Sequence, residues 1–410
     1  MSQSAYIPRP LYFDRIAPYI AKSLIKFLTG QRRVGKSYVL LQIMDEIRIR
    51  YPKSKIIYIN KEDYQFESIK NQADLMEYLG SITKLDEKCF LFIDEIQEIA
   101  NFEIALRSLQ AINDWDIYCT GSNASLLSGD LATYLSGRYI QIRIFSLTYS
   151  EYLQFHALTD STDSFQKYIR YGGMPHLINL IQEDRIVYEY LHNIIDTIVL
   201  RDIISRYNVR NVRFLQDLML YLADITGSIV SAKRISDYLK SQKINLTPKL
   251  VLEYLSHFES VYFVDRVKRK EIEGRKIFEV GDKFYFEDIG MRHALLPFQQ
   301  KDIGKVLESI VYHQLRANAY TVYVGKQAAK EIDFIAERNN EKIYIQVCYL
   351  IVDEATHQRE FGNLLAIHDN CPKYVVSMDE TAGSPYKGIE HLSIRQFLLN
   401  TTDGSLKSLV

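Results

Sequence analysis

The chain has 410 residues, and at about 150 residues per domain this length predicts two to three domains. Its 50 Lys and Arg residues are balanced by 51 Asp and Glu residues, so no overall positive charge draws it to nucleic acid or to a membrane surface. A hydrophobic content of 47% with 25% charged residues is typical of a globular protein and excludes a disordered or fibrous chain.

Neither a membrane span nor an exported, metal-bound protein is indicated. No apolar run approaches the roughly 20 residues that a bilayer requires, and residues 1–10 lack the basic and apolar regions of a signal peptide. The cysteines are widely spaced and form no CxxC pair, which argues against a zinc site or a disulfide framework. They are Cys89, Cys119, Cys348 and Cys371. We therefore expect a cytoplasmic protein with reduced cysteines.

The first third of the chain alternates apolar segments with helical patterns. The segments that predict strands are residues 23–29, 55–59, 89–93, 116–119 and 139–145. Residues 38–47 carry apolar side chains at helical spacing. Strands that are apolar throughout and separated by helices are typical of a parallel sheet covered on both faces. The predicted fold class is therefore α/β.

A glycine-rich motif lies between the first predicted strand and the first predicted helix. Residues 30–37, GQRRVGKS, fit the pattern G-x-x-x-x-G-K-[ST] in the strand–loop–helix context that a phosphate-binding P-loop requires. In such a loop, the lysine reaches the β- and γ-phosphates and the hydroxyl ligates Mg²⁺. The residues expected to contact ATP are Gly30, Arg33, Val34, Gly35, Lys36, Ser37 and the adjoining Tyr38.

Polar residues at later strand ends could complete this site. Asp94 and Glu95 follow an apolar strand, and we expect Asp94 to hold Mg²⁺ and Glu95 to orient the attacking water. Asn123 follows the fourth strand as a candidate γ-phosphate sensor, with a turn-forming role as the alternative. Arg138 opens the fifth strand as a candidate arginine finger or a charge stabiliser within the same chain, although a structural surface arginine explains it at least as well.

The rest of the chain predicts three further parts. Residues 148–210 are helical around a Gly-Gly-Met-Pro break, which indicates a lid above the core of residues 1–147. Residues 211–290 read as three helices followed by a hairpin of strands 261–264 and 276–280, the order of a winged helix. Residues 291–410 return to mixed α/β character, with a helix at 305–317 and strands at 320–324, 331–336, 342–347 and 374–377.

Several motifs carry a resemblance to a known group of proteins. They are GQRRVGKS (30–37), FIDEIQ (92–97), TGSN (120–123), SGR (136–138), YGGMP (171–175), IVLRD (198–202), FYFEDIG (284–290) and EIDF (331–334). With these motifs the chain resembles the AAA+ ATPases, in particular their STAND-like branch. Over almost its whole length it resembles a prokaryotic family that joins an AAA-type ATPase domain to a C-terminal domain of unknown function.

Two further expectations follow from this resemblance. A Gly-x-Pro element in the lid of STAND-type relatives touches the nucleotide, a role that would fall to Gly173 and Pro175 here, although a helix break explains both residues equally well. The last part resembles a restriction-endonuclease-like fold, whose metal site needs a helix Glu, a strand Asp and an acid-x-Lys pair. Glu308 and Asp333 match the first two positions, but Gln346 and Cys348 stand at the third, so we expect an inactive nuclease-like domain.

A cluster of cations in the predicted wing indicates a partner. Lys268, Arg269 and Lys270 could contact DNA phosphates, whereas a solvated hairpin tip or a protein contact would need no DNA. The predicted activity is Mg²⁺-dependent ATP hydrolysis that drives a switch acting on DNA or a protein, with a homo-oligomer required if Arg138 acts in trans. The alternatives are a non-hydrolysing ATP-bound scaffold and a DNA-binding factor.

Overall fold

The chain folds into two compact units. The computed structural model describes residues 6–83, 88–112, 115–127, 134–209, 211–244, 246–272, 276–278, 281–327, 330–380 and 385–401. The first unit contains Met1–Ile144 with Ser260–Tyr262, and the second contains Phe145–Glu259 with Phe263–Val410. The second unit therefore includes the segments predicted as lid, winged helix and nuclease-like domain, and the division of the chain into four domains stays a prediction.

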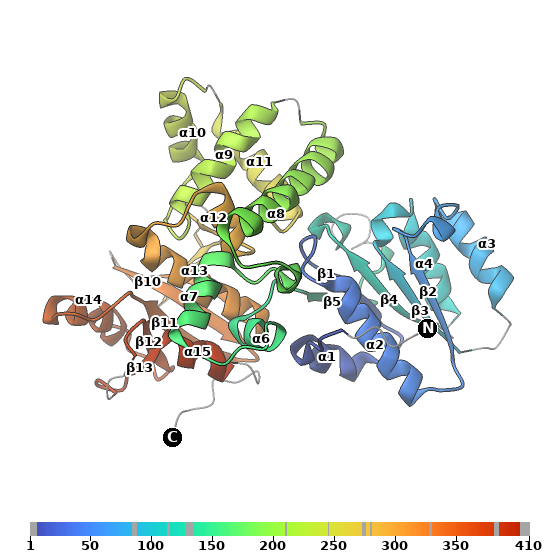
Figure 1. Ribbon diagram of the computed structural model, residues 1–410, viewed down its shortest axis with the longest axis horizontal. Coiled ribbons are helices and arrows are strands. Elements are labelled where there is room, and N and C mark those ends of the chain that lie inside the picture. The colour runs from blue at the N-terminus through green and yellow to red at the C-terminus, as the bar shows by residue number, and fades with distance from the viewer. Residues whose placement is uncertain are drawn as a thin grey trace. The chain divides into compact units, whose positions relative to one another are not determined.

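The first unit contains a parallel sheet, as the apolar segments predicted. Its strands are β1 (Ile25–Thr29), β2 (Lys55–Asn60), β3 (Cys89–Asp94), β4 (Trp115–Gly121) and β5 (Tyr139–Arg143). They lie in the order β2-β3-β4-β1-β5, and every neighbouring pair is parallel. Figure 1 labels the strands of this sheet. Both β1 and β3 are buried along their whole length, which explains why their apolar residues do not alternate with exposed polar ones. The buried Lys26 of β1 forms an ion pair with Asp116 on β4.

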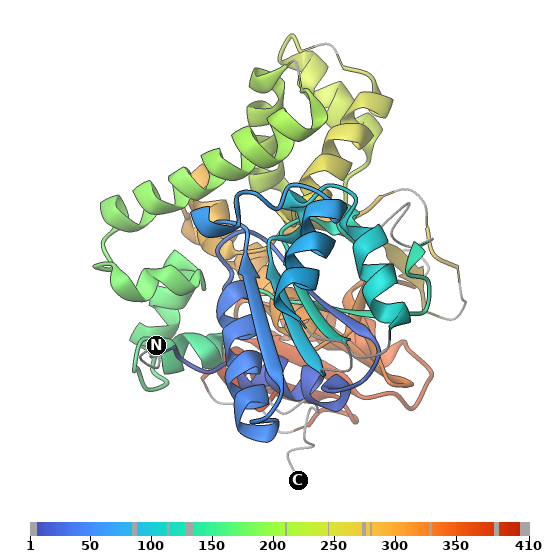
Figure 2. The same cartoon turned by 90° about the vertical axis from the view of Figure 1, so that its right-hand side faces the viewer.

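Helices cover both faces of this sheet (Figure 2). On one face, Leu28 and Phe92 pack with helices α1 (Pro10–Ile16) and α2 (Lys36–Arg50). On the other face, Phe27 and Ile93 pack with helices α3 (Gln72–Ile82) and α4 (Phe102–Ala111). Adjacent residues of one strand thus serve opposite faces. This α/β architecture places the β1–α2 loop at the carboxyl edge of the sheet, beside the ends of β3 and β4.

The second unit begins with helices. They are α6 (Tyr149–Phe155), α7 (Thr162–Tyr171), α8 (Asp184–Thr197), a π-helical continuation (Ile198–Ser205), α9 (Val212–Ile225), α10 (Ala232–Ser241) and α11 (Pro248–Ser260). The last three are the three helices predicted ahead of the hairpin. Short helix α12 (Ile289–Leu295) follows the hairpin.

The hairpin after α11 differs from the predicted one. Strand β6 (Val264–Val267) pairs antiparallel with β8 (Lys283–Phe286), and not with the segment 276–280 that was predicted as the second strand. Within 276–278, Ile277 forms an antiparallel bridge with Lys270. The N–H of Glu271 donates to the oxygen of Lys276, and the N–H of Phe278 donates to the oxygen of Arg269, both at 2.9 Å. Residues 279–280 lie outside the described part of the chain. Strand β8 is buried throughout. The burial of its aromatic residues favours pairing of β6 with β8 over pairing with the segment 276–280.

A mixed sheet forms the end of the second unit, and it includes strand β7 from the predicted wing. The strand order is β13-β12-β11-β10-β9-β7. The strands are β7 (Arg269–Glu271), β9 (Thr321–Gln327), β10 (Lys330–Arg338), β11 (Glu341–Val347), β12 (Lys373–Ser377) and β13 (Glu390–Ser393). Because β7 pairs parallel with β9, the basic segment belongs to this sheet, while its other side bridges antiparallel to Ile277.

Helices lie on both faces of this second sheet as well. Helices α13 (Ile303–Ala317) and α15 (Ile394–Asn400) pack with Phe334 and Ile345, whereas α14 (Glu354–Leu365) packs with Ile335 and Tyr344 on the opposite face. The predicted helix at 305–317 and the four predicted strands that follow it are all present. Helices α14 and α15 and strand β13 are additions that the sequence pattern did not indicate.

Candidate functional site

The loop from β1 to α2 has the backbone conformation of a phosphate cradle. Gly30 and Gly35 adopt φ values of 149° and 95°, a region that L side chains rarely enter. A Cβ atom on Gly30 would lie 2.2 Å from the carbonyl oxygen of Ile144, so only glycine fits at the start of the loop. Gly35 caps α2, whose N-terminus carries a partial positive charge. This loop and helix fit a bound phosphate.

Lys36 extends into the interior of the first unit. Only 4% of the side chain is exposed, and its Nζ donates to the carbonyl oxygen of Gln31 at 3.1 Å. The same ammonium lies 3.6 Å from Oε1 of Glu95, which follows β3. The structure therefore brings together the predicted phosphate-binding lysine and the predicted water-positioning acid.

Asp94 lies beside the hydroxyl groups that a magnesium site would need. Its Oδ1 accepts a hydrogen bond from Thr120 on the neighbouring strand β4, and its Oδ2 accepts one from Tyr58 at 3.3 Å. Burial raises the pKa of Asp94, while hydrogen bonds from Thr120 and Ser37 oppose that rise. Carboxylate and hydroxyl oxygens are ligands that Mg²⁺ accepts, so Asp94 and Ser37 fit the predicted metal.

Glu95 is held by four neighbouring groups. Its backbone is left-handed with a φ of 57°, and its N–H donates to Oγ1 of Thr120 at 2.9 Å. Gln97 Nε2 donates to Oε2 of Glu95 and contacts the Ser122 hydroxyl at 3.4 Å. Burial alone would raise the pKa of Glu95, but the charge of Lys36 and the Gln97 hydrogen bond outweigh it and lower that pKa. The side chain is therefore a carboxylate at neutral pH.

Thr120, Ser122 and Gln97 are site residues for which the sequence analysis assigned no role. Each lies within a motif recognised in the sequence, TGSN or FIDEIQ. Their roles depend on strand register, because β4 lies directly beside β3 and brings Thr120 to both acids. A polar residue at the end of the strand next to the acids is the signal that could have identified them.

The weaker candidates lie in different environments. Asn123 is 5% exposed, directly after β4, whereas Arg138 is exposed and offers its backbone oxygen to Ile25 N–H at the start of β1. Tyr38 is 60% exposed and Arg33 is also exposed. Asn123 thus belongs to the TGSN motif whose Thr120 contacts both acids, whereas the roles of Asn123 and Arg138 stay predictions.

The Gly-Gly element of the second unit has a packing role of its own. The N–H of Gly173 donates to Oδ2 of Asp288 at 2.7 Å, and its oxygen accepts from Leu147 N–H. A Cβ on Gly173 would lie 2.3 Å from the Leu147 oxygen, and one on Gly172 would lie 2.2 Å from Asp288 Oδ1. Pro175 begins the short helix that follows. Asp288, from the FYFEDIG motif, therefore explains the two glycines, and nucleotide contact by Gly173 and Pro175 stays a prediction.

The basic segment at β6 and β7 is partly neutralised. Arg266 forms an ion pair with Asp282 at 2.6 Å, and Lys270 forms one with Glu337 on β10 at 2.6 Å. Lys268 is exposed at the edge of a cavity of about 300 Å³ that Glu259 and other polar residues line. Of the predicted DNA-contacting side chains, Lys268 is the exposed one, while Arg269 and Lys270 are half-buried.

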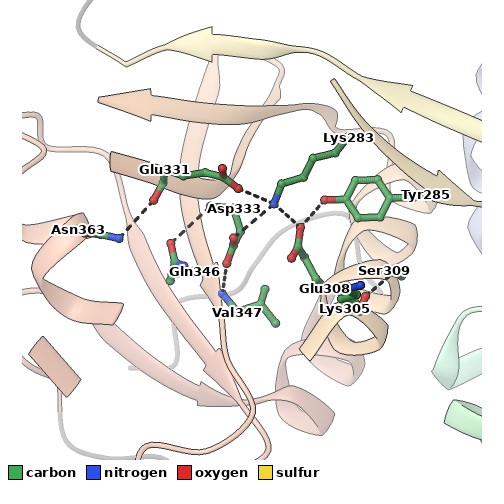
Figure 3. A network of polar contacts seen from close by, with 10 residues as sticks. All are labelled: Lys283, Tyr285, Lys305, Glu308, Ser309, Glu331, Asp333, Gln346, Val347 and Asn363. Carbon is green, nitrogen blue, oxygen red and sulfur yellow. Dashed lines mark hydrogen bonds and ion pairs between the residues drawn. The ribbon is translucent and has the colours of Figure 1, made fainter. Parts of the chain in front are cut away.

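The acids of the predicted nuclease-like site surround a lysine (Figure 3). Lys283, from β8, has a 3% exposed side chain whose Nζ lies 2.6 Å from Glu308 and 3.7 Å from Asp333. Glu331 lies 2.6 Å from the same ammonium. Burial lowers the pKa of Lys283, but the three carboxylates outweigh it and raise that pKa. A cation that belongs to the protein thus lies where the predicted fold would place a metal.

The residues at the acid-x-Lys position do not supply a charge. Gln346 accepts a hydrogen bond from Asp333 N–H at 3.4 Å, and Val347 N–H donates to Asp333 Oδ2 at 2.8 Å. Burial raises the pKa of Cys348 to about 12, so this thiol stays protonated. Within the described residues, no group of three or more His, Cys, Asp or Glu side chains is arranged to hold a metal ion.

Comparison with known proteins agrees with the geometry of the first unit. Residues 22–153 match an AAA domain, and residues 162–302 match a domain of unknown function (DUF8612). An uncharacterized protein of Haemophilus influenzae is 32% identical over 403 residues, which cover 96% of this chain and 99% of that protein. The uncharacterized protein MJ1544 of Methanocaldococcus jannaschii is 30% identical over 351 residues, 82% of this chain and 77% of that protein.

Among solved structures, AMPPCP-bound DnaA from Aquifex aeolicus is similar to part of this chain. The similar region covers 53% of this chain and 69% of the DnaA chain. The identity is 14% and the TM-score is 0.28. In the described part of the chain, no helix is both long and apolar enough to cross a membrane.

Proposed function

The chain belongs to the AAA-domain family that includes the Haemophilus influenzae relative, and we propose that it binds ATP with Mg²⁺ and hydrolyses it. The observation that carries this proposal is the contact between loop and acid: Lys36 lies 3.6 Å from a Glu95 whose pKa is lowered. A protein that only binds nucleotide needs no ionised acid beside its phosphate-binding lysine.

Each side chain has a role that follows from its environment. Lys36 neutralises phosphate oxygens, Ser37 and Asp94 offer oxygens to the metal, and Glu95 accepts a hydrogen bond from a water molecule. Bound Mg²⁺ would neutralise charge that develops on the phosphates. Through its hydroxyl group, Thr120 holds the carboxylate of Asp94 and the backbone N–H of Glu95. We propose Asn123 as a sensor of the γ-phosphate and Arg138 as an arginine finger.

Steady-state phosphate release from Mg-ATP tests the hydrolytic role. Glu95→Gln should retain nucleotide binding but lose about 100-fold or more in turnover, whereas the exposed Glu98→Gln nearby should behave as wild type. If wild type binds ATP without turnover, the protein is a scaffold that uses ATP as a structural ligand. If wild type does not bind a fluorescent ATP analogue, the proposed function is wrong.

The proposed purpose of turnover is a nucleotide-driven switch of the second unit that acts on DNA or a protein. Within that unit we propose a lid at 148–210, a winged helix at 211–290 and a nuclease-like domain at 291–410 that does not cut DNA. Gln346 and Cys348 support the loss of chemistry because neither carries a charge. Mg²⁺- or Mn²⁺-dependent cleavage of DNA by the purified wild-type protein would contradict it.

DNA contact is proposed through the basic segment, with Lys268 as its most accessible residue. Lys268→Glu should weaken duplex binding and reduce its dependence on salt, because phosphate contacts release counterions. Reversal of Lys270 is a poorer test, since a glutamate there would face Glu337 and disturb the sheet. Affinity that does not respond to salt or to Lys268→Glu would favour a protein partner.

Action of Arg138 in trans would require a homo-oligomer. Its exposed position supports this arrangement, because an arginine finger must reach a neighbouring nucleotide. Sedimentation in the presence of ATP should then show an assembly, and Arg138→Ala should lower turnover without lowering nucleotide affinity. A monomer during turnover would contradict a role in trans.

A further inference from the structure

We infer that Arg9, which precedes the first helix, is a positioning residue that fixes the phosphate loop for nucleotide binding. This inference rests on the proposed function and assigns a role to a residue outside every motif described above. Arg9 is 3% exposed although it carries a charge. Charged side chains are seldom buried so completely without a specific partner, so its contacts require an explanation.

The guanidinium of Arg9 holds the phosphate loop through one backbone carbonyl. Its Nη1 donates to the oxygen of Val34 at 2.8 Å, in the middle of the loop. On its other side, Nη2 donates to the Tyr12 hydroxyl at 3.4 Å, and the guanidinium lies 4.6 Å from the centre of the Tyr12 ring. A hydrogen bond with a charged donor is about twice as strong as a neutral one, which suits it to orient a peptide group.

The base of the Arg9 side chain is also fixed in place. Its backbone N–H donates to Oε1 of Gln42 on α2 at 3.0 Å, and its backbone oxygen accepts from Tyr12 N–H as α1 begins. Helices α1 and α2 lie side by side (Figure 1). Arg9 therefore connects the helix that follows the phosphate loop to the loop itself.

Because the peptide bond is planar, the hydrogen bond from Arg9 to the Val34 oxygen also determines the direction of the next N–H group. The carbonyl of Val34 and the N–H of Gly35 belong to one peptide unit, and in a trans unit they point in opposite directions. When Arg9 holds the carbonyl on its own side, the Gly35 N–H is directed to the opposite side. The side chain of Val34 is buried in the core, so the residue is fixed on both sides of its backbone.

This constraint matters because the loop backbone is strained. Arg33 has a φ of 68° and Gly35 a φ of 95°, so the residues on both sides of Val34 adopt left-handed conformations. A non-glycine residue in that region costs about 1 kcal/mol or more, which favours relaxation of the loop when nothing holds it. The bond from Arg9 opposes this relaxation before nucleotide arrives and thereby reduces the ordering that binding must provide.

The experiment compares the two sides of the same guanidinium. Arg9→Met removes the bond to Val34, while Tyr12→Phe removes only the hydroxyl on the opposite side. Equilibrium binding of fluorescent ATP and ADP analogues, steady-state turnover and thermal unfolding are measured for each variant. For Arg9→Met, Kd and KM should rise about tenfold, which corresponds to about 1.4 kcal/mol, and kcat at saturating ATP should change less than about twofold. Tyr12→Phe should keep the wild-type affinity.

A residue that only anchors the N-terminal segment gives a different result. It would lower the melting temperature but leave Kd unchanged well below that temperature, and this outcome would overturn the inference. If Arg9→Met does not fold, Arg9→Gln replaces it, because glutamine stays polar but is too short to donate to the Val34 oxygen. Its Kd should rise as for Arg9→Met, and wild-type affinity would overturn the inference. If wild type itself fails to bind nucleotide, the proposed function fails instead.

Discussion

Substitution of Lys283 by Met should destabilise the second unit strongly, and by more at alkaline pH. The methionine has a similar length but leaves Glu308 and Asp333 without their cation, and these side chains are only 13% and 11% exposed. Removal of one partner from a buried ion pair costs about 3–5 kcal/mol, because the remaining charge is buried without compensation. Glu331, 38% exposed, should add little, as surface pairs contribute about 0–1 kcal/mol.

The pH dependence follows from the directions of the pKa shifts. The pKa of Lys283 is raised above its unfolded value, so its contribution is complete below about pH 10 and lost only at higher pH. Burial and the charge of Glu308 raise the pKa of Asp333, and Lys283 opposes that rise. Without the lysine, Asp333 should retain its proton to higher pH. The free energy of unfolding of Lys283→Met should therefore fall further below that of wild type at pH 8 than at pH 5.

Urea unfolding at these two pH values measures the effect. Lys305→Met is the matched control, since this lysine on α13 donates to a backbone oxygen in an exposed contact. The double variant Lys283→Met with Glu308→Gln should recover part of the loss, because it removes one of the uncompensated charges. A Lys283→Met protein as stable as wild type at pH 8, or equally destabilised at both values, would refute the proposed compensation.

Three further outcomes are expected. Gly173→Ala should lower the free energy of unfolding by about 2 kcal/mol or more, because the new Cβ meets a backbone oxygen at 2.3 Å, whereas Gly304→Ala, with nothing within 4 Å, should not; equal melting temperatures would contradict the close packing. Thr120→Val should lower kcat about 10- to 100-fold by releasing Asp94 and Glu95, with wild-type turnover as the contradictory result. Because the pKa of Glu95 is lowered, the pH–rate profile should show no ionisation of this acid above about pH 5, and an acidic limb near neutral pH would disprove that assignment.

Local sequence patterns predicted the first unit well, because the residues of each strand and of the phosphate loop are sufficient to indicate where the element begins and ends. The buried parallel strands carry mostly apolar residues without alternation, and the phosphate loop combines glycines, a lysine and a hydroxyl in eight consecutive residues. The proximity of Lys36 and Glu95 also followed from the sequence, since the carboxyl ends of parallel strands meet at one edge. A sequence motif and a simple strand order are therefore sufficient to predict a site whose residues all lie at the ends of neighbouring strands.

Contacts between distant segments were not predictable in the same way. Lys283 precedes Asp333 by fifty residues and lies on a different element, so no acid-x-Lys spacing identifies it. Arg9 reaches Val34 only because α1 packs on the same face of the sheet as α2. The pairing of β7 with β9 brings the basic segment into the second sheet, and no local pattern indicates it because the two strands lie more than fifty residues apart in the chain.

Strand β7 also determines where the chain can be divided for separate expression. A fragment of residues 291–410 would lose β7 and expose the edge of β9 to other chains, and it would leave Glu308 and Asp333 without Lys283. A fragment that ends at 290 would separate Lys283 from these acids and would remove β9, the parallel partner of β7. Both pieces should therefore be prone to aggregation, whereas a division between Ile144 and Phe145 keeps this sheet and its ion pairs intact.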